Sequence, residues 1–588
     1  MSEEFTDQVE DRAREILGGD DGKLYDTEVA LDLDFIRDCF KANERGDGLL
    51  LAALIRDHFL YVNDPDGNGE WFFWEGQVWQ KDEDHTLYNV ADCVAQAYED
   101  FAWDVELQRN TVIEEATEER EEAIAKIKQD NNEDSAEKLI DKLLKKELPV
   151  PKWMATTMKN YSSRAYALRS IQRITKAMFI APKVDLSITT RANFLDQKAN
   201  LLPAKNGVID LDRGIIVPGR PDDLLTQRID ISYDPKVDYT PWVEILKDIC
   251  IHPKWEGSEE LPHFLQKFFG YCCSGYTSEE IITVFYGPGR NGKGTIIEPI
   301  TKALGPFFHK ANRSLFIEQK YEPSPSAASE HMYAMKGKRL VVGAETNKGQ
   351  NIDGGRIKDL TGGNEINFRK NFGSENHYTA THKLILETNN IPPGLTKEFS
   401  LKERLVLIDF YWRFVHDIEE SEKQKPALKG RFKKKDTKLK QKLKTPEYQI
   451  MILRWLVDGY QLWKKEGLDV PACCKQSSHD LEKNENTLQR FTEEVLIQIP
   501  LNEDGSGDRR RIPLGKLYDI AFKWWWGENM DGAAKMTHKN TLSTYLSENG
   551  FDKDKKGGTI YIFQVDIHPD IKKSHEDFQG LAESYIHR

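Results

Sequence analysis

A glycine-rich segment, VFYGPGRNGKGTIIEPI at residues 284–300, limits the possible folds of this chain more than any other part of the sequence. Apolar, β-prone residues at 281–286 come first, glycines and a lysine follow, and a stretch that can begin a helix comes last. A strand, a glycine loop and a helix in this order are typical of a phosphate-binding loop, where backbone N–H groups and the helix N-terminus surround a phosphate. We therefore expect an α/β core with the loop at the end of a buried parallel strand.

The loop supplies the candidate nucleotide ligands. They are Gly287, Pro288, Gly289, Arg290, Asn291, Gly292, Lys293, Gly294 and Thr295. Lys293 is expected to reach the β- and γ-phosphates of ATP. The usual pattern places a hydroxyl residue directly after the lysine, but Gly294 stands there, so Thr295 is the candidate ligand of Mg²⁺. A GKGT ending also occurs in small nucleotide kinases, which leaves a phosphotransferase as an alternative.

Three polar residues at the ends of later apolar strands complete the predicted ATP site. Glu345 ends RLVVGAE, where an acid can activate the attacking water or hold the Mg²⁺ shell. Asn389 follows the strand in HKLILETNN and can position that water against the γ-phosphate. Arg404 precedes the strand in ERLVLIDF and can reach the γ-phosphate of a neighbouring subunit. Each residue alone also fits an ordinary turn or surface ion pair, and their order along the chain is what favours catalysis.

The composition fits a soluble protein of several domains. The 588 residues correspond to about four domains of ~150 residues. With 39% hydrophobic and 30% charged residues and no run of about 18 apolar residues, no membrane span is expected. Seven cysteines without a CxxC pair disfavour a zinc module and suit a reducing cytoplasm, here that of a host cell. A net charge of −15 disfavours coating of nucleic acid by bulk charge but leaves room for a local channel.

Basic residues gather in three later segments. Residues 367–383 predict a hairpin whose Arg369 and Lys370 can contact phosphates and whose Phe372 can stack on a base. The lysine-rich run 423–444 either faces DNA or is a solvated connector. Near the C-terminus, an order of helix, turn, helix and hairpin predicts a winged helix. Its candidate DNA contacts are His538, Lys539, Lys555 and Lys556.

At these motifs the sequence resembles the superfamily 3 DNA helicases. The closer resemblance is to the C-terminal helicase part of phage and plasmid primase–helicases, which is also related to the poxvirus primase–helicase. GPGRNGKGT, RLVVGAET and LILETNNIPP match the family's motifs A, B and C, and Arg404 matches its arginine-finger position. The resemblance covers about residues 50–565. Asn347 and Asn364 stand where this family often has acids, which leaves the details of metal and water handling open.

The resemblance implies a P-loop core of AAA+ type, a hexameric ring, and translocation on single-stranded DNA that depends on ATP and Mg²⁺, with an expected 3′ to 5′ polarity. It also implies a mixed α/β region before the core and a winged helix after it. The DxD in LDLDF, residues 31–35, has too little chain around it for a primase domain. We therefore expect a helicase that works with a primase or polymerase supplied in trans.

Shifts in composition and the positions of the motifs divide the chain into six expected parts. They are a small mixed α/β module (1–103), a charged helical segment (104–148), a pre-helicase domain (149–280), the ATPase core (281–412), a basic connector and helix (413–484) and the winged-helix domain (485–588).

The sequence thus predicts an ATP-dependent replicative DNA helicase of a phage, virus, plasmid or integrated element, acting on fork or origin DNA as a homo-oligomer. The alternative is an ATP-dependent initiator that binds and melts an origin without processive unwinding. A nucleotide switch with slow turnover and a nucleotide kinase are also open, although the motifs after the loop favour water as the phosphate acceptor.

Overall fold

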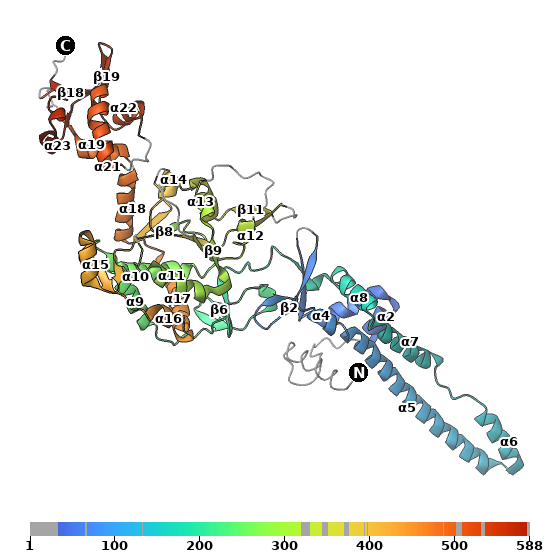
Figure 1. Ribbon diagram of the computed structural model, residues 1–588. Helices are drawn as coiled ribbons and strands as arrows, with labels where there is room; N and C mark the ends of the chain where they lie inside the picture. The colour runs from blue at the N-terminus through green and yellow to red at the C-terminus, as the bar shows by residue number, and fades with distance from the viewer. Residues whose placement is uncertain are drawn as a thin grey trace.

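The computed structural model describes residues 33–584, except 65–66, 132, 288, 319–329, 344–350, 370–374, 393, 397, 486, 501–507 and 531–535. These residues form a helical N-terminal domain, a central α/β body and a C-terminal domain, which follow one another in an elongated arrangement (Figure 1). None of the described helices has both the length and the apolar character needed to cross a membrane.

A five-stranded sheet in the order β14-β8-β13-β10-β9 forms the centre of the α/β body. All of its neighbouring strands are parallel. Apart from the edge strand β9, they are largely apolar runs, because parallel sheets are covered on both faces. The strands are β8 (Ile282–Tyr286), β9 (Phe308–Ala311), β10 (Leu340–Gly343), β13 (Lys383–Thr388) and β14 (Leu405–Asp409).

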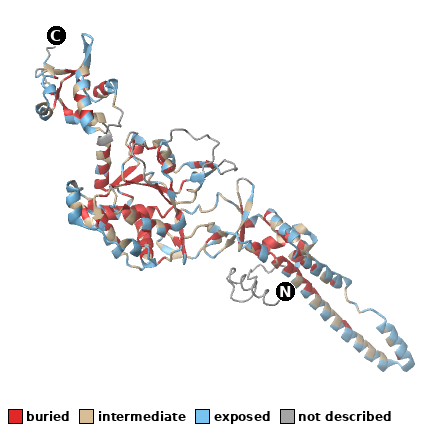
Figure 2. Cartoon of the chain, in the orientation of Figure 1, coloured by how far each residue is buried: buried red, intermediate tan, exposed pale blue. Residues whose placement is uncertain are grey.

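Helices and a hairpin cover the two faces of this sheet. Successive strand residues point to opposite faces, so Phe285 packs in one core cluster and Val284 in the other. Figure 2 shows buried residues concentrated in and beside the sheet. The first face is covered by α9 (Thr240–Cys250), α10 (Leu261–Tyr271), α11 (Lys293–Leu304) and α17 (Pro446–Glu466). The second is covered by α12 (Glu330–Tyr333), α13 (Gly354–Thr361), α14 (Phe399–Lys402) and the antiparallel pair β11 (Glu365–Arg369) and β12 (Glu375–Thr379).

A small antiparallel sheet precedes the central body in the chain and is attached to α17. It consists of β5 (Leu201–Ala204), β6 (Gly207–Asp210) and β7 (Ile215–Val217). In the turn after β6, Asp212 accepts a hydrogen bond of 2.7 Å from the Tyr460 hydroxyl and forms an ion pair with Lys464. These contacts fix the small sheet to the body that carries the glycine loop.

The lysine-rich run 423–444 folds against the central body. It lies within a unit made of β15 (Arg413–Val415), α15 (Ile418–Gln424), β16 (Phe432–Lys434) and α16 (Leu439–Lys442). Lys433 pairs with Asp248 of α9 at 2.8 Å, and Lys440 pairs with Glu298 of α11 at 2.7 Å. Acids of the central body therefore neutralise part of this run.

The N-terminal domain combines packed helices with a four-stranded sheet of order β3-β2-β1-β4. Its strands are β1 (Phe59–Asn63), β2 (Gly69–Trp74), β3 (Trp79–Lys81) and β4 (Thr189–Arg191). Its helices are α2 (Leu33–Lys41), α3 (Glu44–Ile55), α4 (Thr86–Val90), α5 (Cys93–Asp130), α6 (Glu133–Leu144), α7 (Lys152–Leu168) and α8 (Ile171–Val184). Helix α5 runs without interruption through residue 103, where the sequence analysis placed a boundary, because its first turns belong to the domain core.

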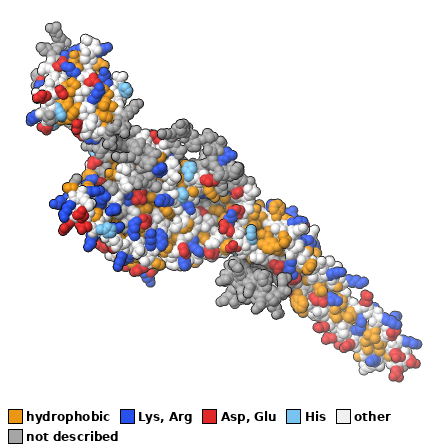
Figure 3. Space-filling view, viewed as in Figure 1, with side chains coloured by type: hydrophobic (Ala, Val, Ile, Leu, Met, Phe, Trp, Pro, Cys, Tyr) orange, Lys and Arg blue, Asp and Glu red, His pale blue; other side chains and the backbone are white. Residues whose placement is uncertain are grey.

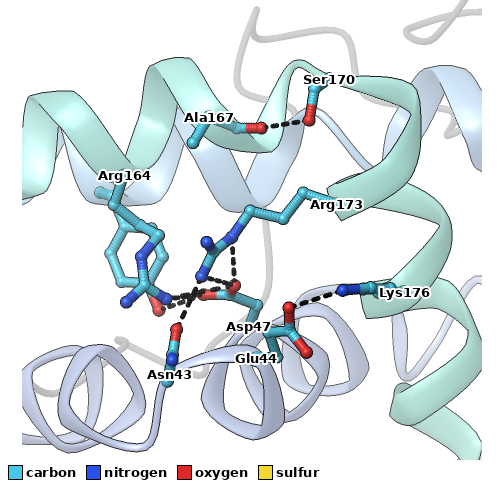
Figure 4. A network of polar contacts seen from close by, with 9 residues as sticks. Asn43, Glu44, Asp47, Arg164, Ala167, Ser170, Arg173 and Lys176 are labelled. Atoms are coloured by element: carbon cyan, nitrogen blue, oxygen red, sulfur yellow. Dashed lines mark hydrogen bonds and ion pairs between the residues drawn. The ribbon is translucent and has the colours of Figure 1, made fainter.

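A buried carboxylate joins the helices of this domain (Figure 4). Asp47 on α3 is 1% exposed and accepts hydrogen bonds from Arg164 of α7 at 3.0 Å, Arg173 of α8 at 2.9 Å and the Tyr98 hydroxyl of α5 at 3.2 Å. A carboxylate is stable at such depth only with charged and hydrogen-bonding partners. Asp47 therefore fixes α3 against three other helices.

The C-terminal domain is joined to the central body by α18 (Ala472–Glu485), whose Leu481 packs in the core beneath the sheet. The domain contains α19 (Thr487–Val495), β17 (Leu496–Gln498), β18 (Arg510–Pro513), α20 (Leu514–Lys516), the π-helix η7 (Leu517–Phe522), α21 (Lys523–Asn529), α22 (Lys539–Glu548), β19 (Lys553–Lys556), β20 (Thr559–Phe563), β21 (Val565–Ile567), α23 (Pro569–Ser574) and β22 (Glu583–Ser584). Trp525 and Trp526 are buried in its core. Strands β19 and β20 form an antiparallel hairpin.

Candidate functional site

The glycine loop between β8 and α11 is shaped by residues with positive φ. Gly289 has φ +83° and Gly292 has φ +92°, a conformation that favours glycine, and Arg290 between them has φ +57°. A side chain at position 292 would also place its Cβ 2.7 Å from Ile249. The loop therefore turns tightly against α9 and directs the chain into the first turn of α11.

Lys293 connects the loop to the end of the neighbouring strand. It is the first residue of α11 and is 4% exposed. Its ammonium donates hydrogen bonds to the Gly287 carbonyl at 2.7 Å and to Asn389 Oδ1 at 2.9 Å. Asn389 directly follows β13, which lies beside β8 in the sheet. The structure thus brings together two site residues that are 96 positions apart in the sequence.

A cavity of about 700 Å³ opens beside this pair. Residues 289–295 of the loop and α11, including Thr295, form one wall. Residues of α9 and of the segment around β16 and α16 form the others, and they mix apolar with charged side chains. The remaining lining residues are Glu244, Ile245, Asp248, Ile249, Glu298, Glu387, Asn389, Phe414, Lys435, Asp436, Leu439 and Lys440.

Glu387 belongs to this cavity and was missed in the sequence. It lies on β13 opposite Phe285 of β8, and its side chain is partly buried. Burial raises the pKa of the Glu387 carboxyl, and the nearby Lys293 ammonium lowers it in part. Glu387 precedes Asn389 by two residues, a spacing that places both on one face of a strand. That spacing is the signal that could have identified it.

The basic segment around Lys435 and Lys440 was also missed as a part of this site. The sequence analysis left the run 423–444 open between a DNA-facing surface and a connector. In the structure Lys435 and Lys440 line the cavity. No local sequence pattern could indicate this, because it depends on the packing of α16 against α11 through the Lys440–Glu298 pair.

Arg404 lies at the other end of the sheet. It immediately precedes β14, whose first residue, Leu405, pairs with Ile282 at the start of β8, whereas Lys293 comes after the end of β8. The Arg404 guanidinium donates to the Glu280 carbonyl at 3.1 Å and forms an ion pair with the Glu280 carboxylate. Within one chain, therefore, Arg404 does not reach the cavity.

Several predicted site residues fall outside the described part of the chain. They are Pro288, Glu345, Lys370 and Phe372. The strand that precedes Glu345, β10, ends at Gly343, which pairs with Leu386 of β13. The end of β10 thus lies at the edge of the sheet where Asn389 and Lys293 meet.

The described candidates for DNA contact are all exposed. Arg369 ends β11 of the hairpin on the second face of the sheet. His538 and Lys539 lie at the start of α22, and Lys555 and Lys556 lie on β19. The last four share one domain, at the opposite end of the molecule from α5 (Figure 1).

Comparison with known proteins gives matches in the N-terminal and central parts of the chain. Residues 49–251 match the family described as D5 N terminal like, and residues 285–404 match a family of unknown function, DUF5906. The chain is 25% identical over 377 residues to a protein of Acanthamoeba polyphaga mimivirus named as helicase L207/L206, and this match covers 63% of the chain. It is 24% identical over 232 residues to a protein of Sputnik virophage named as helicase V13, over 37% of the chain.

These matches span only 38% and 29% of the two relatives' own lengths. A solved structure of the NrS-1 C-terminal region aligns with 67% of this chain and 88% of its own, at 12% identity and a TM-score of 0.36, which is too low to establish a common fold. Segment 49–251 matches a D5-type N-terminal region, segment 285–404 matches a second family, and the viral relatives are named as helicases. In these parts the chain is similar to the primase–helicases of phages and viruses.

Proposed function

We propose that this chain is an ATP-driven DNA helicase that works as a ring in the replication of a virus, phage or other mobile element, and that it translocates 3′ to 5′ on single-stranded DNA. The observation that carries the proposal is the contact between Lys293 and Asn389 at the edge of a parallel sheet, inside a cavity of about 700 Å³. Ligand sites of parallel sheets lie outside the carboxyl ends of the strands. A cavity of this volume suits a nucleotide.

The residues present fit a nucleoside triphosphate. The first turn of α11 lines the cavity and places the positive end of the helix dipole beside it. The Lys293 ammonium exchanges its Gly287 and Asn389 contacts for phosphate oxygens when the triphosphate binds. Asn291 has a buried amide nitrogen without a partner among the described residues, a donor that a bound phosphate can use after a small shift of the loop. Apolar Ile245, Phe414 and Leu439 suit the base.

The donor set also fits Mg²⁺, which prefers oxygen ligands and keeps several waters. Thr295 offers a hydroxyl, and Glu345 and Glu387 offer carboxylates. When bound, Mg²⁺ neutralises charge that develops on the phosphates during transfer. Glu345 or Glu387 accepts the proton of the attacking water, Asn389 orients that water, and Lys293 holds the γ-phosphate.

A ring is supported by the position of Arg404. An arginine that stabilises phosphoryl transfer is worth about 10³–10⁵ in rate. Because Arg404 is held at the far end of its own sheet by Glu280, it can serve only the site of another copy. DNA then lies near the β11–β12 hairpin, where Arg369, Lys370 and Phe372 supply phosphate contacts and a stacking surface.

The test is ATP hydrolysis with and without single-stranded DNA for the wild type, for Arg404→Ala, and for mixtures of the two. We expect DNA to stimulate the wild type and Arg404→Ala to lower kcat by roughly 10³-fold. In mixtures, activity should fall more steeply than dilution predicts, because each variant subunit disables its neighbour's site. Arg213→Ala, at an exposed arginine, is the control.

Independent behaviour of the two proteins in the mixtures, without stimulation by DNA, would rule out a ring motor. Polarity is measured separately by strand displacement on duplexes that carry either a 3′ or a 5′ single-stranded tail. Displacement from the 5′ tail alone would reverse the proposed direction.

A second candidate function, an origin-binding initiator, is supported by the C-terminal domain. Its exposed α22 start and its β19–β20 hairpin have the order of a winged helix, and α18 holds them away from the central body (Figure 1). In this function the chain melts a specific origin and releases it. Permanganate footprinting on origin DNA combined with a failure to displace long strands would favour the initiator over the helicase.

A further inference from the structure

The N-terminal domain exposes an unusual share of large apolar side chains. In the described part of the chain, 11 of 19 exposed large hydrophobic residues lie between residues 88 and 194. On α7 and α8 they are Trp153, Tyr166, Ile171 and Phe179, which are 55%, 81%, 71% and 66% exposed. On α5 and α6 they are Trp103, Leu107, Leu139 and Leu144. Figure 3 shows hydrophobic side chains gathered on the surface over α8. Apolar surface of this extent marks a contact with a partner.

The two helix pairs of the domain carry opposite charge. Residues 152–184, which contain α7 and α8, have seven Lys and Arg and no Asp or Glu. Residues 93–144, which contain α5 and α6, have fifteen Asp and Glu against six Lys and Arg. Part of the basic charge is used inside the domain, at Asp47, Glu44, Asp92 and Glu99. Among the described residues, no acid forms an ion pair with Lys152, Lys159 or Lys183, and all three are exposed.

Helices α5 and α6 form an arm that extends away from the rest of the domain (Figure 1). Helix α7 covers only the first part of α5, where Tyr161 stacks on Phe101 and Arg169 pairs with Glu99. Beyond Val105, Ala116 is the one buried residue of α5, although the helix continues to Asp130. At 1.5 Å per residue, this part of the helix is roughly 40 Å long. A long helix with so little burial in its own chain gains stability when a second surface covers it.

We propose that the α5–α6 arm of one copy of this chain lies on the α7–α8 face of the next copy. The proposal rests on the proposed function, because it supplies a subunit contact for the ring. A contact between two different surfaces joins subunits head to tail and closes into a ring when the rotation allows. Apolar side chains on both surfaces provide the buried area, and the opposite charges determine which surface meets which.

Single-stranded nucleic acid is the competing occupant of the α7–α8 face, because lysines and aromatic rings also suit phosphates and bases. Exposed aliphatic side chains on the face favour a protein partner over nucleic acid. Ile171 on the face, and Leu107 and Leu144 on the arm, gain from burial and offer no ring for stacking. The acid-rich arm of the same chain supplies a partner of matching charge.

Charge reversal tests the contact in the full chain. The face variant carries Lys152→Glu, Lys159→Glu and Lys183→Glu. The arm variant carries Glu118→Lys, Glu119→Lys and Glu122→Lys. The control carries Lys205→Glu, Lys236→Glu and Lys475→Glu, at exposed lysines outside this domain. Mass photometry with ATPγS and Mg²⁺ measures assembly, and circular dichroism checks that each variant is folded.

We expect the wild type and the control to form the ring and each reversal variant to fall to the 67.8 kDa monomer. An equal mixture of the face and arm variants should assemble again, because the arm of each variant then matches the face of the other. This recovery cannot arise from misfolded chains.

Other outcomes overturn the proposal. If either reversal variant alone assembles normally, the arm does not bind this face, although a ring still forms. A face variant that assembles but loses several-fold in affinity for single-stranded DNA assigns the face to nucleic acid. A mixture of folded variants that stays monomeric shows that the two surfaces do not meet. A wild type that stays monomeric overturns the ring itself, and with it the proposed motor.

Discussion

At the scale of single residues, the polar groups of the candidate site surround one buried ammonium, that of Lys293. Lys293 is held between the Gly287 carbonyl and Asn389, and it lies close enough to Glu387 to lower the pKa of that carboxyl. Burial alone acts in the opposite direction, since it disfavours the charged carboxylate. Burial raises the pKa of this carboxyl and the ammonium lowers it in part. Beside the proposed phosphate site, such a carboxylate can accept a proton from water.

Replacement of Glu387 by glutamine is expected to lower kcat of ATP hydrolysis by roughly 10²-fold and to leave ATP affinity nearly unchanged. The physical reason is that glutamine keeps the size of the side chain but cannot accept the proton. Stopped-flow binding of a fluorescent ATP analogue and steady-state hydrolysis measure the two effects. Glu298→Gln is the matched control, because Glu298 also lines the cavity but is exposed and paired with Lys440.

The pH profile separates a catalytic carboxyl from a structural one. The pKa of Glu387 is raised by burial, so activity that needs the carboxylate is lost as pH falls through this raised value. In Glu387→Gln that acid limb should disappear. If Glu387→Gln loses activity at low pH in the same way as the wild type, another residue accepts the proton.

At the scale of elements, the domains are held by a few buried polar contacts within apolar cores. Asp47 joins α3 to α5, α7 and α8, and the Asp212 contacts join the small β5–β6–β7 sheet to α17. Such contacts add orientation to packing that is otherwise non-directional. They place the loop, the sheet edge and the helix faces relative to one another.

Removal of the Asp47 carboxylate should destabilise the N-terminal domain by about 3–5 kcal/mol, because Arg164 and Arg173 would keep buried charge without their partner. Urea unfolding of Asp47→Ala followed by circular dichroism measures this loss. Glu44→Ala removes the exposed pair with Lys176 and should cost far less, because solvent screens an exposed pair. Equal costs for the two variants would show that the buried network contributes nothing beyond surface pairing.

At the scale of the whole molecule, the C-terminal domain has a core of its own, whereas Val78 of the N-terminal domain packs with Val208 of the small β5–β6–β7 sheet. The C-terminal core cluster draws all of its residues from 488–582, and none from the central body. The link between them is α18, which is fixed to the central body by Leu481 and by the Lys402–Glu482 pair. A separate core allows the C-terminal domain to bind a partner without rebuilding the cavity beside Lys293.

A chain that ends at residue 485 should therefore fold and keep ATP hydrolysis within about threefold of the full chain, because none of the described residues of the C-terminal domain lines the cavity. It should lose most of its affinity for duplex DNA, since His538, Lys539, Lys555 and Lys556 are removed. Hydrolysis assays and fluorescence anisotropy with a labelled duplex check the two expectations. Loss of hydrolysis in a folded truncated chain would mean that the C-terminal domain completes the ATP site.

Much of the candidate site could be predicted from the sequence, because its parts are short and local. The strand, loop and helix around Lys293 and the apolar strand before Asn389 are visible as patterns of a few residues. Glu387 was overlooked although the pattern of its strand contains it. The roles of Glu345, Lys370 and Phe372 remain predictions, since these residues lie outside the described part of the chain.

The parallel α/β core and the glycine loop follow from the sequence alone, because each depends on residue types at fixed short spacings. The packing of the chain, by contrast, brings Lys435 and Lys440 to the cavity, keeps Arg404 away from it, and extends the acid-rich helices α5 and α6 away from the rest of their domain. The sequence could not show these relations because of the distance along the chain. These relations join residues that are tens to hundreds of positions apart, and packing between elements, not local preference, sets where they meet.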